Sequence, residues 1–434
     1  MLNDEQEKAV MARDRFIFLL AGAGSGKTRV IIEKIKRLIH EGVFPNEILA
    51  ITFTRKTSIE MKERLNHPDV HIHTFHQLAY IILKEQLHLS FEMVDDSITK
   101  EFTDYELLQI TNYKNSMMTL KKPSKYLKYQ QRLHEKKMFD FDDLLLELLN
   151  HIHKGHVNLT YTYIFIDEFQ DTNKLQYALL KKMIKPKTHV FAVGDPDQSI
   201  YQFRGATPKI IDTYVLEYKA VIYTLSVNYR SDSSIIHAAN SLIKRNHRSY
   251  KKELKPHSKN IGTTLSYRFN NDLDEALWVI ETIVHYKHKG IPFNNIAVLY
   301  RNHFRAYQLI MSLYEKDIPF HIHQGDDLLR DSAINLMTIH QAKGLEFDIV
   351  FIIGCEDRVL PSHRQNMKSA YEEERRLMFV AITRAKHILY LTSIILNQDN
   401  HYFTISPFIS ESGLKSTHVK LISDIISLGD NDGR

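Results

Sequence analysis

Short apolar runs alternate with amphipathic stretches along most of the chain. Residues 16–20 (FIFLL) form an apolar run of the length expected for a buried strand. A stretch over residues 28–40 follows, in which Ile31, Ile35 and Leu38 are spaced to share one face of a helix. Because strands alternate with helices, the pattern predicts an α/β fold with a parallel, doubly wound sheet. The further strands expected in this first domain are 48–53, 162–166, 189–193 and 221–225.

The alternation stops between residues 85 and 155. This stretch is polar, basic and helical in pattern, with no convincing strand, which predicts a helical subdomain inserted into the first domain. From about residue 226 the alternation resumes, so we expect a second α/β domain. Its expected strands are 263–269, 295–300, 319–323, 334–337, 348–353 and 387–393.

The composition is that of a soluble protein with several domains. The chain has 434 residues, of which 43% are hydrophobic and 25% are charged. Its single cysteine, Cys355, leaves no disulfide within the chain, as is usual in a reducing cytoplasm. The first residues have no apolar signal core and no run of 18 apolar residues occurs, so we expect a cytoplasmic protein without a membrane segment. A net charge of +5 permits a nucleic-acid partner without demonstrating one.

Residues 21–28 (AGAGSGKT) stand between the predicted strand at 16–20 and the helix that follows. In this setting glycines allow a tight loop whose backbone N–H groups surround phosphates at the positive end of the helix. Lys27 would reach the β- and γ-phosphates, and the Thr28 hydroxyl would bind Mg²⁺. The strict pattern begins with glycine and this chain has Ala21, but the strand–loop–helix context supports the same interpretation. We therefore expect ATP and Mg²⁺ as cofactors.

An acidic motif, IFIDEFQD at residues 164–171, includes the end of another predicted strand. Asp167 stands where the carboxyl ends of parallel strands meet ligands, and its carboxylate suits Mg²⁺. Glu168 suits the base that activates water for phosphoryl transfer. The alternative is a pair of helix-capping carboxylates at a strand end, which the presence of the phosphate loop makes less favoured.

Phosphoryl transfer also favours arginine near the developing negative charge. Arg230 in LSVNYRS and Arg384 in VAITRAK are the candidates, both in or near the second domain. If they reach ATP bound to the first domain, the nucleotide would join two lobes, and their closing and opening would drive movement. The alternative for each arginine is a surface ion pair.

Ten motifs follow one another along the chain: LNDEQEKAV (2–10), AGAGSGKT (21–28), ITFTRKTSIEMKERL (51–65), HTFHQLAYIIL (73–83), FDFDDLL (139–145), IFIDEFQDTN (164–173), VGDPDQSIYQFRGA (193–206), LSVNYRS (225–231), TIHQAKGLEF (338–347) and EEERRLMFVAITRAK (372–386). This ordered set resembles the UvrD/Rep-type superfamily 1 (1A) DNA helicases over nearly the whole chain, and it is far more specific than a phosphate loop alone. The implied fold is a pair of RecA-like P-loop NTPase domains with parallel sheets and a helical 1B insertion in the first.

The resemblance implies further roles in nucleotide binding. Gln6 would read the adenine edge, and Tyr229 would stack on the base. Glu346 would contact the ribose, and Gln198 would sense the γ-phosphate and link it to DNA-contacting residues of its segment. The two arginines named above would be arginine fingers. The full set implied for nucleotide, Mg²⁺ and catalysis is Gln6, Gly22, Ala23, Gly24, Ser25, Gly26, Lys27, Thr28, Arg29, Asp167, Glu168, Gln198, Tyr229, Arg230, Glu346 and Arg384.

The resemblance also implies a path for single-stranded DNA, along which aromatic rings stack on bases without sequence preference. Phe53, Tyr201 and Phe203 fall at these positions, and Phe203 stands where many relatives have tryptophan. The alternative for each ring is packing in the core. The other candidates for DNA contact are Thr52, Thr54, Arg55, Thr74, His76, Arg204, Thr338 and His340.

One large difference from the full-length helicases concerns their 2B subdomain. There, 2B lies between the segments that match residues 318–325 and 338–347, but here only about a dozen residues separate the two. The motor would be intact without 2B, whereas regulated, processive unwinding of duplex would be in question. The expected domains are 1A (1–84 and 156–224), 1B (85–155), 2A (225–425) and a tail (426–434).

The sequence therefore predicts a DNA-dependent ATPase that moves as a translocase and helicase on single-stranded DNA and at junctions with duplex. A 3′→5′ direction and a place in DNA repair follow from the resemblance alone. The alternative is a motor or switch subunit of a repair, recombination or defence complex, in which a partner protein supplies 2B-like contacts or a nuclease. A phosphate-loop ATPase unrelated to nucleic acid would leave the ordered motifs unexplained.

Overall fold

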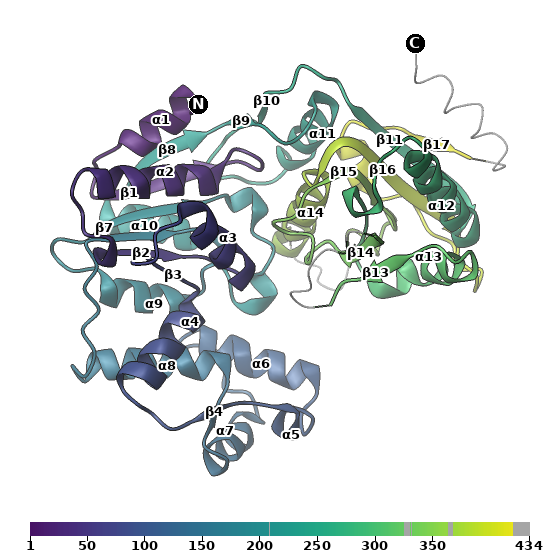
Figure 1. The fold of residues 1–434 in the computed structure, drawn as a ribbon. Coiled ribbons are helices and arrows are strands. Elements are labelled where there is room, and N and C mark those ends of the chain that lie inside the picture. Colours follow the sequence, from purple (N-terminus) through teal and green to yellow (C-terminus); the bar gives the residue numbers. More distant parts are fainter. Residues whose placement is uncertain (208, 325–329, 331, 363–367, 420–434) are drawn as a thin grey trace. The chain divides into compact units, whose positions relative to one another are not determined.

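The computed structural model describes residues 1–207, 209–324, 330, 332–362 and 368–419. The chain divides into two compact units, the first made of residues 1–21 and 26–225 and the second of residues 22–25 and the chain from 226 onward. Each unit is an α/β structure built on a parallel sheet, which confirms the predicted fold class (Figure 1). The expected tail at 426–434 lies outside the described residues. The finer domain boundaries stay a prediction.

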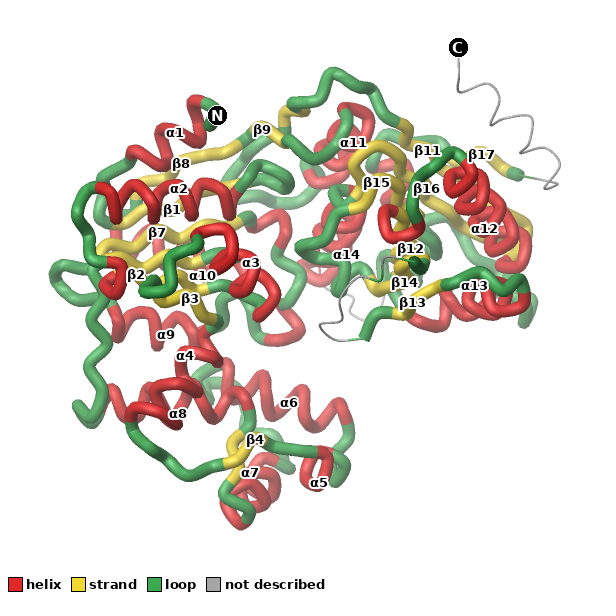
Figure 2. Tube along the Cα trace, in the orientation of Figure 1, coloured by secondary structure: helices red, strands yellow, loops and turns green. Residues whose placement is uncertain are grey.

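The first unit alternates strands with helices, and Figure 2 shows helices on both sides of its sheet. The expected strands of this unit are present, with ends that differ by one or two residues. Its elements are α1 (Asp4–Met11), β1 (Phe16–Ala21), α2 (Lys27–His40), η1 (Pro45–Glu47), β2 (Ile48–Ile51), α3 (Arg55–Leu65), β3 (His71–His73), α4 (Phe75–Ile81), the π-helical η2 (Ile82–Gln86), β4 (Glu92–Met93), α5 (Asp96–Thr99), α6 (Asp104–Asn115), α7 (Tyr126–Glu135), β5 (Met138–Phe139), α8 (Phe141–His153), β6 (Tyr163–Ile166), η3 (Phe169–Asp171), α9 (Lys174–Met183), β7 (His189–Gly194), η4 (Pro196–Gln198), η5 (Gln202–Arg204), α10 (Lys209–Tyr218) and β8 (Val221–Leu225).

The main sheet of this unit has six parallel strands in the order β3-β2-β6-β7-β1-β8. Strand β1 is buried along almost its whole length, as expected for a parallel sheet that is covered on both faces. On one face Ile31 of α2 joins the core formed with Ile17 and Leu19. On the other face the Phe18 ring lies near Phe169, which contacts Tyr214 of α10. The carboxyl ends of these strands therefore form one common edge.

Between β3 and β6 the chain forms the helical segment that contains α4 to α8, in the lower part of Figure 1. Helices α5 to α7 close around a small apolar core of their own, which includes Phe102 and Tyr129. The expectation that this stretch has no strand is wrong, because β4 and β5 pair in parallel. Each strand has only two residues, which is too short for an alternating pattern to appear in the sequence.

A buried lysine ties this helical segment together. Lys114 in α6 is fully buried, and its Nζ lies 2.7 Å from Asp140 Oδ2 and 2.7 Å from Asp143 Oδ1 at the start of α8. Burial would lower the pKa of Lys114, but these two carboxylates outweigh it and raise the pKa. The next residue, Asn115, accepts a 3.0 Å hydrogen bond from Asn173 Nδ2, just before α9. Helix α6 is thus joined both to α8 and to the segment that follows the acidic motif.

The second unit has its own alternation of strands and helices. Of the residues described, none forms a helix with the length and apolar character needed to cross a membrane, in either unit. The elements of the second unit are β9 (Val227–Asn228), α11 (Ser233–Ile243), β10 (Lys255–Pro256), β11 (Thr263–Asn271), α12 (Asp272–His288), η6 (Phe293–Asn295), β12 (Ile296–Tyr300), α13 (His303–Glu315), β13 (Phe320–Ile322), β14 (Ile334–Thr338), β15 (Phe347–Ile352), α14 (Lys368–Ile382), β16 (Ala385–Leu396), α15 (Pro407–Glu411) and β17 (Ser416–His418).

The main sheet of the second unit has seven parallel strands in the order β13-β14-β12-β15-β16-β11-β17. Trp278 of α12 packs on it against the rings of Phe269, Phe351 and Tyr390. Six strands of this sheet were expected from the sequence, whereas β17 and the separate pair β9 and β10 were not. The missed strands are two or three residues long.

We expect Lys114→Met to destabilise the first unit by about 3–5 kcal/mol, because it leaves two carboxylates in a buried site without their cation. The midpoint of urea unfolding measures this loss. Lys128→Met is the matched control, since the Lys128 side chain is 53% exposed and its ion pair with Glu101 is long, at 3.6 Å. Equal midpoints for the two variants would contradict the structural role assigned to Lys114.

Candidate functional site

The phosphate loop joins β1 to α2. Gly24 and Gly26 have φ angles of 64° and 81°, in the left-handed region that favours glycine. Ser25 closes the loop by donating a 2.8 Å hydrogen bond from its hydroxyl to the Gly22 carbonyl. Helix α2 begins at Lys27, and its N-cap residue, Gly26, provides no side-chain hydrogen bond to the first turn. This turn also has no acidic residue. The first N–H groups of α2 and the positive end of its dipole therefore suit a phosphate.

The structure brings Lys27 and Glu168 together. Lys27 Nζ lies 2.5 Å from Glu168 Oε1, and both side chains are mostly buried. Glu168 follows β6 with φ 51° and ψ 42°, an unusual conformation for a residue with a side chain. It precedes the short helix η3 but makes no side-chain cap to it, so Glu168 is not the capping carboxylate of the alternative interpretation. Asp167 Oδ1 accepts the Glu168 N–H at 2.9 Å.

The first unit also contains four other residues predicted to bind nucleotide or Mg²⁺: Gln6, Gln198, and Thr28 and Arg29 in the first turn of α2. Gln6 is buried in α1, and a Cβ placed on Gly26 would come within 2.9 Å of its Nε2, so Gln6 lies against the end of the phosphate loop. Gln198 is buried too, and its Nε2 donates a 2.6 Å hydrogen bond to Asp195 Oδ2. Arg29 is exposed in the first turn of α2.

The tip of the loop, residues 22–25, belongs to the second unit and is bonded to the residues just after position 226 within that unit. Asn228 Nδ2 donates a 2.7 Å hydrogen bond to the Ala23 carbonyl, and the Tyr229 N–H donates a 2.9 Å bond to the Gly24 carbonyl. A Cβ on Gly24 would lie 2.6 Å from Asn228 Nδ2, so the approach also requires glycine there. Asn228 Oδ1 in turn accepts the Arg230 N–H at 2.9 Å. One buried amide thus connects the loop to the backbone that carries Arg230.

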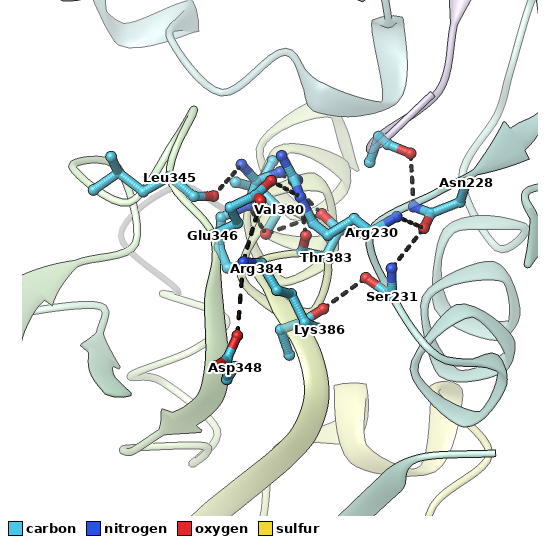
Figure 3. A network of polar contacts seen from close by, with 12 residues as sticks. Asn228, Arg230, Ser231, Leu345, Glu346, Asp348, Val380, Thr383, Arg384 and Lys386 are labelled. Atoms are coloured by element: carbon cyan, nitrogen blue, oxygen red, sulfur yellow. Dashed lines mark hydrogen bonds and ion pairs between the residues drawn. The ribbon is translucent and has the colours of Figure 1, made fainter. Parts of the chain in front are cut away.

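Arg230 and Glu346, both predicted to act on nucleotide, are paired with each other (Figure 3). Arg230 Nε donates to Glu346 Oε2 at 2.7 Å, and its Nη1 donates to the Thr383 carbonyl at 3.1 Å. Burial would raise the pKa of Glu346, but Arg230 and Lys386 outweigh burial and lower it. The ion pair that was the alternative for Arg230 is therefore present in this structure, between residues of one unit.

Arg384 has a different environment. Its side chain is 2% exposed, so it is not the surface residue of the alternative interpretation. Nε and Nη1 donate to the carbonyls of Val380 and Leu345 at 2.9 and 3.0 Å, and Nη2 donates to Thr383 Oγ1 at 3.2 Å (Figure 3). The guanidinium is held by the segments before β15 and before β16.

The aromatic residues predicted to contact DNA form a row at the carboxyl edge of the first sheet. The rings of Phe53 and Tyr201 stack with centroids 5.1 Å apart and an interplanar angle of 25°. Phe203 continues the row, 6.1 Å from Tyr201, and is 42% exposed. None of the three rings is buried, which disfavours core packing as their main role.

The other predicted DNA residues are mostly engaged in local contacts. Thr54 and Thr74 cap α3 and α4, accepting the backbone N–H groups three residues on. Thr52 Oγ1 donates to the Thr54 carbonyl at 3.1 Å, and Thr338 Oγ1 donates to Gln341 Oε1 at 2.9 Å. Arg55 is exposed in the first turn of α3, whereas His340 is partly buried after β14. The Arg204 side chain lies outside what the structure describes.

His76 is neutral at neutral pH. Burial lowers its pKa to about 4, despite the opposing effect of Asp140. Its ring meets Phe141 edge-on with centroids 5.6 Å apart. As a neutral ring, His76 cannot supply a positive charge to a phosphate, so stacking or hydrogen bonding is the contact it could make.

Comparison with known proteins identifies the family. The sequence pattern of the UvrD/REP helicase N-terminal domain matches residues 2–125 and 91–219, and that of the UvrD-like helicase C-terminal domain matches residues 223–331 and 323–395. The chain belongs to the UvrD/REP helicase family. The resemblance predicted from the order of the motifs is confirmed, and with it the enzyme class of a DNA-dependent ATPase of the helicase type.

The individual relatives differ in how much of their length they share with this chain. A probable DNA helicase of Mycoplasma pneumoniae is 33% identical over 470 residues, which cover 94% of this chain and 86% of that protein. ATP-dependent DNA helicase PcrA of Staphylococcus epidermidis is 32% identical over 74% of this chain and 50% of its own length. PcrA of Staphylococcus aureus is 29% identical over 98% of this chain and 65% of its own length. The chain thus spans from half to about two thirds of these PcrA proteins.

Two buried side chains of this family member are absent from the residues proposed by sequence reasoning. Asn228 joins the phosphate loop to Arg230, and Gln170 contacts Glu168. Both lie inside motifs that were recognised, VNYR and DEFQD. Their place within these motifs was the only feature of the sequence that could have pointed to them. An amide carries no charge and has no characteristic spacing, and no role was drawn from the resemblance for these two amides as it was for Gln6 and Gln198.

The depressed pKa of His76 predicts a pH dependence of stability. Because the folded pKa of about 4 is below the unfolded value near 6.5, the unfolded chain binds more protons between these values. Stability therefore falls as pH falls from 6.5 towards 4, and above 6.5 this contribution is constant. Thermal unfolding from pH 7.5 to 5 tests it: His76→Gln should show a shallower fall than the wild type. An unchanged slope would mean that His76 titrates normally in the folded protein.

Proposed function

We propose that the chain is an ATP-driven motor that moves along single-stranded DNA. The observation that carries this proposal is the combination, within one unit, of a Lys27–Glu168 pair at the phosphate loop and an aromatic row that is not buried. Tyr201 of this row follows Gln198 by three residues in the same motif. A site for phosphoryl transfer and a surface for stacking on bases would then be parts of the same loop system. Family membership supports the same conclusion.

In the proposed hydrolysis, Glu168 accepts a proton from a water molecule as its oxygen attacks the γ-phosphorus. The bond from that phosphorus to the β–γ bridging oxygen breaks, and ADP leaves. Lys27 stabilises the negative charge on the β- and γ-phosphates. The Thr28 hydroxyl and the Asp167 carboxylate offer the oxygen donors that Mg²⁺ prefers, and Mg²⁺ bound there would neutralise phosphate charge. The proposal keeps the roles that the family resemblance implies for Gln6, Tyr229, Glu346, Arg230 and Arg384.

On the DNA side, bases would stack on Phe53, Tyr201 and Phe203, a contact that any base can make. The polar and basic candidates named from the sequence would contact the backbone. The 3′→5′ direction, the preference for junctions and the division into 1A (1–84 and 156–224), 1B (85–155) and 2A (225–425) are part of this proposal. A role in DNA repair is proposed on the family resemblance alone.

A second candidate function is a motor subunit that needs a partner protein for unwinding. It is favoured by the short connection between two strands: β13 ends at Ile322, and β14 begins at Ile334. A 2B subdomain would stand at this position, so its contacts with duplex DNA would have to come from another protein. Robust unwinding by the purified chain alone would exclude this second function.

The hydrolysis proposal predicts distinct effects for two variants. Glu168→Gln should lower the kcat for ATP hydrolysis by about 10²- to 10⁴-fold, because the base is lost while the shape is kept. Lys27→Ala should abolish the stimulation of hydrolysis by oligothymidine. Lys36→Ala is the control on the same helix, since its side chain is 49% exposed. Hydrolysis by the wild type that oligothymidine does not stimulate would overturn the proposal of a DNA motor.

The stacking proposal predicts a loss of DNA coupling in Phe203→Ala. The oligothymidine concentration for half-maximal stimulation should rise about tenfold, as expected when one base loses its aromatic partner. Phe44→Ala removes a phenylalanine that is 69% exposed and outside the row, so it should behave as the wild type. If both variants responded equally to oligothymidine, the row would not be a DNA contact.

A further inference from the structure

Gln170 contacts both motifs that frame the candidate hydrolysis site. It lies in η3 two residues after Glu168, and its side chain is fully buried. Its Nε2 donates to Glu168 Oε2 and, at 3.3 Å, to Asp171 Oδ2. Its Oε1 accepts the backbone N–H of Asp195 at 2.9 Å. Each end of the amide therefore has a partner of the opposite hydrogen-bonding character.

The contacts continue on both sides of this amide. Glu168 is bonded to Lys27 through its other oxygen, at 2.5 Å. Asp195 uses Oδ2 to accept the 2.6 Å hydrogen bond from Gln198. A continuous series of contacts, which includes the backbone N–H of Asp195, thus runs from the phosphate loop to the loop that leads to the aromatic row. Gln170 is its central member, and only a side chain with both a donor and an acceptor can fill that place.

Gly194, the last residue of β7, gives an independent indication that this place is specific. A Cβ added to Gly194 would lie 2.6 Å from Gln170 Oε1 and 3.2 Å from the Gln170 backbone nitrogen. The φ angle of Gly194 is not in the left-handed region, so space rather than backbone conformation excludes a side chain. The end of β7 therefore packs closely against Gln170 and restricts the position of its side chain.

We infer that Gln170 is a positioning residue for hydrolysis, which orients the Glu168 carboxylate and couples it to the Gln198 loop. This inference rests on the proposed function, because it assigns Glu168 the part of the base. A buried amide that donates to one carboxylate oxygen leaves the carboxylate few orientations, which is the requirement for a base that must meet one water molecule. Movement of the Asp195 backbone would be transmitted to Glu168 through the same amide.

Gln170→Glu tests this with almost no change of shape. The new carboxylate can still accept the Asp195 N–H, but it cannot donate to Glu168 and places a negative charge beside it. We expect kcat to fall about 10- to 100-fold, with the KM for ATP within about threefold of the wild type. A neighbouring like charge raises the pKa of a carboxyl group, so the acidic limb of the pH–rate profile should move to higher pH.

Gln176→Glu is the matched control. Gln176 is 8% exposed at the start of α9, and its Oε1 accepts the Asn173 N–H at 3.1 Å in a capping box. Glutamate serves equally well at this position of a capping box. The same chemical change, six residues further on, should leave kcat, KM and the pH profile unchanged.

Gly194→Ala provides a second variant that keeps Gln170 itself. Its Cβ must displace the Gln170 amide, so kcat should fall and the pH profile of stimulated hydrolysis should change as Glu168 loses its fixed orientation. The double variant Gly194→Ala with Gln170→Glu should lose less than the product of the single effects, because both remove the same contact. Thermal unfolding shows which of the variants remain folded.

The outcomes separate the inference from the function on which it rests. A wild type that hydrolyses no ATP, with or without oligothymidine, would overturn both. A wild type that hydrolyses ATP, with Gln170→Glu matching Gln176→Glu in kcat and pH profile, would overturn the positioning role alone. A rise in KM without a fall in kcat would do the same. If Gln170→Glu does not fold, Gly194→Ala decides: an unchanged kcat and pH profile would overturn the role, and a reduced kcat at unchanged KM would support it.

Discussion

The contact between Lys27 and Glu168 depends on the whole order of the first sheet. The two residues are 141 positions apart in the sequence and follow strands β1 and β6, which are separated by β7. They meet because parallel strands end at one common edge, so that loops far apart in the chain are gathered there. An order that moved β1 away from β7 and β6 would separate the two charges. The left-handed conformation of Glu168 belongs to the same arrangement, since a backbone held in this way needs well-packed surroundings.

Buried polar groups impose the next constraint on the molecule. Gln170, Asn228 and Lys114 are each removed from water and each bind two or more partners. A buried amide or ammonium group that lost one partner would cost more than the contact itself contributes, so such groups hold their neighbours in one arrangement. The partners of Gln170 and of Asn228 are parts of different motifs, whereas both partners of Lys114 lie at the start of α8. The motifs of this family are therefore connected by amides and charges within each unit, as well as by the apolar cores beneath them.

Much of the fold was predictable because the apolar pattern is repeated in long strands. The run at 16–20 and the helical face of Ile31, Ile35 and Leu38 are buried as expected. The strands that were missed, such as β4 and β17, are too short to show a period and lie where pairing with a neighbour, rather than side-chain pattern, defines them.

The candidate site was predictable to a different degree. The residue types of the phosphate loop and of the acidic pair are dictated by the chemistry of phosphate and water activation, so they could be recognised singly. Residue type alone could not decide whether each arginine acts on nucleotide or forms a surface ion pair. Arg384 proved buried and Arg230 paired with Glu346, and neither result has a signal in the local sequence.

The sequence by itself determined the main strands and helices, which loop suits phosphate, and to which family the order of motifs points. These properties depend on local periodicity and on residue chemistry within a few positions. Only the tertiary structure decided which polar groups are partners: Gln170 with Asp195, Asn228 with Ala23 and Lys114 with Asp140. The physical reason is that a buried donor must be satisfied by whichever acceptor the packed sheet brings to it, and that acceptor can be 205 residues away in the chain.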